Sequence, residues 1–123
     1  MKRYQVDNLK NYQKYKGWIC GHFLDPGMVN KNSDLEVKIN TLKPEETEPE
    51  HFHPQGKTVI FIIKGRIKWI FDGQEHILGK NDFAYLEEGV HETIVEVFKP
   101  TTIVSIRTPS VPNNRVKVKS PTK

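Results

Sequence analysis

Apolar and polar residues alternate along most of the chain, and this two-residue period is the pattern of β-strands. The alternation is clean in the expected strand 35–42, where apolar side chains take every second place from Leu35 to Ile39. Only residues 6–15 suggest a short helix. The expected strands are 18–24, 35–42, 51–53, 58–64, 66–71, 74–78, 82–86, 91–98 and 101–107. Many short strands at regular spacing predict an all-β sandwich or barrel.

Turn residues separate the expected strands. The Asp72-Gly73 pair predicts a tight hairpin, because both residues tolerate the left-handed backbone that a two-residue turn requires. A strand is expected to end before Gly65 and another to start after it. Pro100 is expected to break the chain between two further strands, because proline has no amide hydrogen to donate to a sheet.

Length and composition indicate one globular domain. The chain has 123 residues, of which 36% are hydrophobic and 28% charged. No run approaches the ~20 apolar residues of a membrane span, and the first residues lack the apolar stretch of a secretory signal. Cys20 is the single cysteine, so no intrachain disulfide forms. We therefore expect a cytoplasmic protein with no membrane partner.

The formal net charge of +4 comes from the two ends of the chain. The last sixteen residues hold four basic side chains and no acidic one, and the remaining 107 residues hold 15 of each sign. Three segments are therefore expected: a basic N-terminal segment (1–17), a β domain (18–107) and a basic C-terminal tail (108–123), either loose or a short edge strand. Nucleic acid is not the expected partner, because no basic and aromatic stripe crosses the strands.

The triplet His51-Phe52-His53 carries the clearest chemical signal. Residues i and i+2 of a strand point to the same face, so both imidazoles can reach one metal ion. A divalent metal needs further ligands from elsewhere in the chain. The glutamates within residues 45–50 are expected to form a solvated loop, with a lid or an extra oxygen ligand as the alternative.

His91 is the expected third ligand, because it opens another strand just after a glycine turn. It shares a face with Val95 and Val97, which is the more apolar face and therefore the expected inward one. Glu92 then points the other way. A β-bulge after Gly89 would reverse this parity and make Glu92 the ligand instead.

The stretch Pro49–Ser105 resembles the cupin superfamily. Residues 51–65 match the first cupin motif, which is His-x-His, four residues, glutamate, six residues and glycine, except that Thr58 stands where the family usually has a glutamate ligand. Residues 81–91 resemble the second motif, with Glu87 in place of its proline and the histidine one residue early. The resemblance implies a single-domain double-stranded β-helix, or jelly-roll barrel, with a site inside it.

Without the glutamate, the resemblance implies a metal site of His51, His53 and His91. Such a set is similar to that of the thiol dioxygenase branch of the cupins, which holds iron with three histidines. One divalent transition metal is expected, either iron, zinc, nickel or manganese. Tyr85 and His22 are the candidate proton donors. A cation among imidazoles attracts a small anionic substrate, such as a carboxylate or a phosphate.

Two further functions stay open. Some cupins that isomerise nucleotide-linked sugars are metal-free, and the same histidines would then act as acid and base. A non-catalytic metabolite-binding or regulatory module is the other. Small cupins are commonly homodimers, and the expected contact combines the N-terminal segment with one face of strand 58–64. That contact face is Val59, Phe61 and Ile63, while Thr58, Ile60 and Ile62 are expected to point inward.

Overall fold

The computed structural model describes residues 3–118 and shows one mostly β domain. In this part of the chain, one 3₁₀ helix precedes eight strands. They are η1 (Leu9–Tyr15), β1 (Trp18–Cys20), β2 (Glu36–Leu42), β3 (Glu48–Phe52), β4 (Lys57–Phe71), β5 (Gln74–Gly79), β6 (Phe83–Leu86), β7 (Glu92–Thr108) and β8 (Val116–Lys117). The all-β prediction is confirmed. No helix among the described residues is long and apolar enough to span a membrane.

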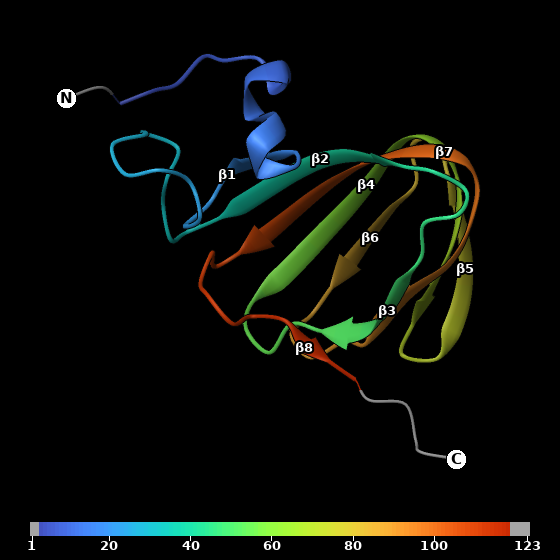
Figure 1. The fold of residues 1–123 in the computed structure, drawn as a ribbon. Helices are drawn as coiled ribbons and strands as arrows, with labels where there is room; N and C mark the ends of the chain where they lie inside the picture. Colours follow the sequence, from blue (N-terminus) through green and yellow to red (C-terminus); the bar gives the residue numbers. More distant parts are fainter. Residues whose placement is uncertain (1–2, 119–123) are drawn as a thin grey trace.

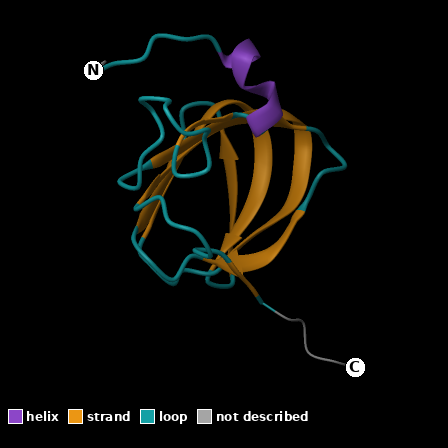
Figure 2. Ribbon diagram, turned by 60° about the vertical axis from the view of Figure 1, so that its left-hand side comes forward, coloured by secondary structure: helices purple, strands orange, loops and turns teal. Residues whose placement is uncertain are grey.

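Two long strands, β4 and β7, hold the sheet together. They pair antiparallel along nearly their whole length. Strands β5 and β6 pair with β4, while β2 and β3 pair with β7. At the margins β1 adds to β2, and β8 adds to β3. The sheet curls into a barrel, with η1 lying outside it next to β1 (Figures 1 and 2).

The sheet bends where the sequence predicts strand ends. Strand β4 runs through Gly65 and β7 runs through Pro100. The register between the two strands shifts on both sides of Gly65, and Pro100 falls in the shifted stretch, where it has no partner in β4. The backbones approach so closely that a Cβ on Gly65 would lie 2.4 Å from the Cα of Thr101. The expected breaks are therefore wrong, because a bulge tolerates both residues and curves the strands.

The interior is built on one face of β4. As predicted, Thr58, Ile60 and Ile62 are buried, and the face continues after the bulge with Ile67 and Trp69. Apolar side chains from the other strands complete the core, namely Leu86, Ile94, Val97 and Ile103. Burial of this many large side chains is the main source of stability in a domain of this size.

The opposite face of β4 lies on the outside of the barrel. Val59, Phe61 and Ile63 are partly exposed there, beside the exposed rings of Phe83 and Tyr85 on β6. This is the face expected to contact a second copy of the chain. Only one chain is described, so the homodimer stays a prediction.

The C-terminal segment folds back onto the barrel as far as Val118. Ser110 is completely buried, Asn114 is nearly so, and β8 pairs with β3. Of the two expectations for this segment, the short edge strand is correct up to Val118. The remainder of the expected basic tail, residues 119–123, lies outside the described residues.

Candidate metal centre

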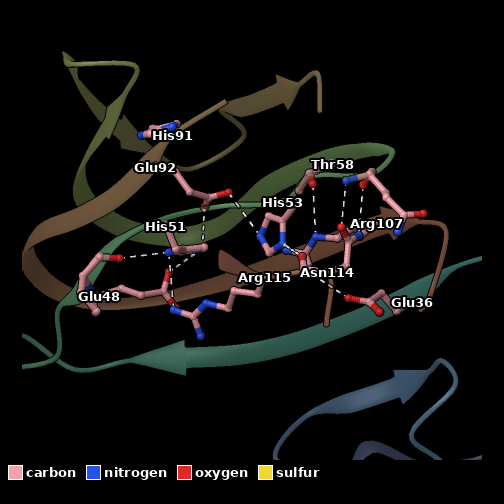
Figure 3. A network of polar contacts seen from close by, with 12 residues as sticks. Glu36, Glu48, His51, His53, Thr58, His91, Glu92, Arg107, Asn114 and Arg115 are labelled. Atoms are coloured by element: carbon pink, nitrogen blue, oxygen red, sulfur yellow. Dashed lines mark hydrogen bonds and ion pairs between the residues drawn. The ribbon is translucent and has the colours of Figure 1, made fainter. Parts of the chain in front are cut away.

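Strands β3 and β7 bring three buried side chains together. His51, His53 and Glu92 are 3%, 7% and 3% exposed, and one donor atom from each lies within 4.8 Å of the others. The Nε2 atom of His51 is 3.8 Å from one carboxylate oxygen of Glu92, and Nε2 of His53 is 3.7 Å from the other (Figure 3). Two imidazoles and a carboxylate are ligands typical of divalent transition metals. These three residues form a candidate metal centre, which is called the metal centre for short below.

The extended backbone of β3 explains the histidine pair, as the sequence predicts. His51 and His53 point inward, and Phe52 between them points outward, where its ring stacks on that of His91 at 4.8 Å. Glu92 joins them because it lies directly opposite His51 in the β3–β7 ladder. Residues that face one another across an antiparallel pair share a face of the sheet.

Backbone carbonyl groups fix the orientation of both imidazoles. The Nδ1 atom of His51 is 3.0 Å from the carbonyl oxygen of Pro49, and Nδ1 of His53 is 2.5 Å from that of Asn114. A carbonyl oxygen only accepts, so each Nδ1 carries the hydrogen and each Nε2 keeps its lone pair for the centre. Arg115 lies 3.4 Å from the same nitrogen of His51, but that nitrogen cannot accept while it donates to Pro49.

Two atoms of the centre lack a hydrogen-bond partner among the described residues. They are Nε2 of His53 and one carboxylate oxygen of Glu92, and both are buried. An unpartnered buried polar group costs about 1–3 kcal/mol, so folded proteins rarely keep one without a reason. Both atoms are electron-pair donors, and a bound cation would satisfy both at once. The three residues therefore fit a divalent metal ion.

Burial also shifts the pKa values of these groups. Desolvation lowers the pKa of His53 to about 4, with the positive charge of Arg107 adding to the effect, and desolvation lowers the pKa of His51 as well. Desolvation raises the pKa of Glu92 to about 7. The imidazoles are therefore neutral at physiological pH, which is their metal-binding form. The carboxylate becomes charged only near neutrality unless a cation stabilises it.

His91, the expected third ligand, does not point into this centre. Its ring lies apart from the other three side chains (Figure 3), at the surface, where Nδ1 is 2.7 Å from the carboxylate of Glu50. Its backbone N–H donates to Asp72. The expected inward orientation is wrong because β7 begins one residue later, with Glu92 and then Ile94 on the buried face. Glu92, the alternative ligand, is the residue that lies beside His51 and His53.

The two expected proton donors also lie away from the centre. Tyr85 pairs with Val59 on the outward face of the barrel, so its hydroxyl is at the surface. His22 lies beyond the end of β1, where its Nδ1 is 2.8 Å from the hydroxyl of Ser110. Neither side chain lines the cavity that contains the metal centre.

That cavity has a volume of about 170 Å³. Part of its wall is apolar, with Ile60, Ile94 and Ile103 beside the ring of Trp69. Glu48 also lines it, 3.9 Å from Nε2 of His51, so one glutamate of the expected loop does reach the site. Three cationic side chains also line it: Lys38 from β2, Arg107 from β7 and Arg115 from the segment before β8.

Sequence reasoning missed all three cations and Trp69. Lys38 and Arg107 occupy polar places in alternating strands, which usually face solvent, and Arg115 lies in the expected tail. The one available signal was that Glu36 and Lys38 are two residues apart in one strand. Their side chains therefore point to the same face, so if one points into the barrel the other does too.

Comparison with known proteins agrees with this architecture. Residues 38–106 match the sequence profile of a family described as Cupin domain. No curated protein matches the chain.

Three solved structures illustrate the likeness. DMSP lyase DddQ from Ruegeria pomeroyi is 17% identical, with a TM-score of 0.62, over 71% of this chain and 44% of the lyase. An uncharacterized conserved protein with a double-stranded β-helix domain from Klebsiella pneumoniae is 22% identical, with a TM-score of 0.62. The match covers 72% of this chain and 74% of that protein's chain. KdgF from Halomonas sp. is 12% identical, with a TM-score of 0.61, and the match covers 67% of this chain and 74% of the KdgF chain. The chain thus spans less than half of the lyase, and identities this low show a common fold alone.

Proposed function

The chain belongs to the cupin family, and we propose from this premise that it is a metal-dependent enzyme acting on a small anionic metabolite. In this proposal His51, His53 and Glu92 hold one divalent transition-metal ion. One observation carries the proposal: the two unpartnered donor atoms, on His53 and Glu92, are buried in the wall of a cavity. Such atoms remain costly to the folded chain until a cation binds them.

When bound, the metal would supply Lewis-acid polarisation of a substrate oxygen. The chain's own residues orient the ligands and shape the cavity around them. The carbonyl groups of Pro49 and Asn114 hold the two imidazoles in their metal-binding tautomer. Isoleucines of the cavity wall exclude water, which strengthens every charge interaction inside.

Glu48 is the best-placed group for proton transfer. Its carboxylate lies 3.9 Å from Nε2 of His51 and is partly exposed, so it can exchange protons with solvent at the cavity mouth. Arg115 lies 3.6 Å from the same carboxylate and orients it. We therefore assign to Glu48 the role expected of Tyr85 and His22, because it lines the cavity and they do not.

The experiment is the metal content of the untagged protein, purified without chelator and measured by elemental mass spectrometry. Wild-type protein should carry about one transition-metal ion per chain, and Glu92→Gln and His53→Ala should carry almost none. His91→Ala is the matched control and should keep the wild-type content, because its ring lies outside the centre. Retention of metal by Glu92→Gln, or loss of metal from His91→Ala, would contradict the proposed ligand set.

A metal-free acid–base enzyme is the second candidate. The observation that favours it is the pKa of Glu92, which burial raises to about 7, a value suited to proton transfer at neutral pH. This candidate predicts no bound metal as purified, and no uptake when zinc, iron, nickel or manganese is titrated into the protein. The same elemental measurement therefore separates the two functions.

A further inference from the structure

The three cations of the cavity differ in how their charges are compensated. Arg107 is fully engaged: its guanidinium lies 2.6 Å from the buried carboxylate of Glu36 and also donates to the hydroxyl of Thr58. Arg115 lies at the mouth, half exposed and 3.6 Å from Glu48. Both arginines therefore already have a negative partner within the chain.

Lys38 has none. Among the described residues, no carboxylate lies within 4.0 Å of its ammonium group, and its one aromatic contact is the ring of Trp18, 5.3 Å from Nζ to the centre of the ring. Burial lowers the pKa of Lys38, and the two arginines lower it further, against the attraction of Glu48. A partly buried cation without a partner has an unfavourable desolvation free energy, which an anion bound from solution would offset.

The remainder of the cavity is suited to a small apolar body. Ile60, Ile94 and Ile103 line it, and its volume of about 170 Å³ is close to the ~150 Å³ of an engineered cavity that binds benzene. The indole N–H of Trp69 is buried in the same wall, and its interaction with the carboxylate of Glu92 opposes the desolvation that raises the pKa of that carboxyl. The cavity thus offers an apolar surface and, on Lys38, one cation without a carboxylate partner.

We infer that the cavity binds a small monocarboxylate of roughly the size of benzoate, with its carboxylate on Lys38 and its apolar body against the isoleucines. This inference rests on the proposed function for its reacting centre and adds the substrate class to it. A single free ammonium matches one carboxylate charge, since the arginines are already neutralised. Lys38 is therefore the residue that selects the anion.

The test compares benzoate with benzamide, its neutral isostere, by isothermal titration calorimetry. Wild-type protein should bind benzoate about tenfold or more tightly than benzamide, the preference expected of one charge-assisted hydrogen bond. Lys38→Met keeps the apolar stem and removes the charge, so the ratio of the two affinities should fall to near one. Lys68→Met is the matched control, because Lys68 lies outside the cavity beside Glu75.

Both zinc-loaded and chelator-treated proteins are titrated, and the zinc content of each variant is measured. The selectivity should depend on Lys38 in both forms, while Lys38→Met should keep the wild-type zinc content. If the proposed function is wrong and this inference is right, the wild-type protein will bind no zinc but will still prefer benzoate to benzamide. A preference that survives in Lys38→Met, or is absent from both wild-type forms, overturns the inference.

A second readout needs no variant and so does not depend on how Lys38→Met folds. Acetic anhydride acetylates exposed lysines, and peptide mass spectrometry measures the rate at each one. Benzoate should slow the acetylation of Lys38 severalfold and leave that of Lys68 unchanged, while benzamide should slow neither. Equal protection of Lys38 by both compounds would also overturn the inference.

Discussion

Two buried polar clusters lie in the same barrel, and they differ in whether their polar atoms have hydrogen-bond partners within the chain. The Glu36 cluster consists of Glu36, Arg107 and Ser110, and the metal centre consists of His51, His53 and Glu92. In the first cluster one oxygen of Glu36 accepts from Arg107 at 2.6 Å, and the other accepts from Ser110 at 3.0 Å. In the metal centre, two buried donor atoms have no partner among the described residues.

The difference shows that a buried charge alone does not mark a functional site. The Glu36 cluster joins β2, β7 and the C-terminal segment, and every bond it makes is internal, so its effect is on stability. The metal centre also contains a buried carboxylate, but one of its oxygens and one imidazole nitrogen have no partner among the described residues. Natural proteins tolerate this cost where function requires it.

Removal of Glu36 should have the largest effect on stability. Glu36→Ala leaves the guanidinium of Arg107 without its carboxylate, and loss of one partner from a buried pair costs about 3–5 kcal/mol. Urea unfolding followed by circular dichroism measures the change. The double variant Glu36→Ala/Arg107→Met should recover much of the loss. A loss below about 1 kcal/mol in the single variant would show that the cluster does not stabilise the fold.

Glu92→Gln should act in the opposite direction in chelator-treated protein. Burial raises the folded-state pKa of Glu92 from 4.5 to about 7, so the folded state binds this proton more tightly than the unfolded state does. The resulting stability is present below about pH 4.5 and is lost as the pH rises through 7. Glutamine never ionises, so at pH 8 the variant should be more stable than wild type by up to about 3 kcal/mol. Parallel stability curves for the two proteins between pH 5 and 8 would contradict this expectation.

Zinc should stabilise the protein through the metal centre. At a free concentration one hundred times the dissociation constant, a ligand specific for the folded state adds about 2.7 kcal/mol to the free energy of unfolding. Thermal unfolding with and without zinc measures the effect, which should be present in wild type and absent from Glu92→Gln. Equal zinc stabilisation of the two proteins would place the cation elsewhere.

His91→Ala should have the smallest effect. The pair of His91 with Glu50 is at the surface, and exposed ion pairs contribute about 0–1 kcal/mol. Urea unfolding should therefore give a stability close to that of wild type, with unchanged zinc stabilisation. Loss of the zinc effect in this variant would restore the three-histidine set that the sequence predicts.

Most strands could be predicted from the sequence, because the two-residue period and the turn residues are local properties. The same holds for His51 and His53, since i and i+2 share a face in any strand. The continuity of β4 and β7 could not be predicted. Gly65 and Pro100 end strands in most contexts, and only their position at the bulge between the two strands makes them compatible with pairing.

The orientation of β2 shows the limit of reading hydrophobic alternation alone. Leu42 at its end lines the cavity, but Ile39 points away from it and lines a surface groove with Leu9 and Tyr12 of η1. Glu36 and Lys38 therefore point inward, against the usual rule. The reason is that residues of η1 lie beside Ile39 across this groove, so the outer face of the strand is partly screened from solvent there.

The sequence by itself determined the cupin resemblance, the all-β fold and two of the three residues of the metal centre. Only the tertiary structure decided the third, because a shift of one residue along a strand moves a side chain to the opposite face. His91 and Glu92 are neighbours in sequence, and the pairing of β7 with β3 places Glu92 opposite His51. That register comes from contacts between strands far apart in the chain, which no local pattern specifies.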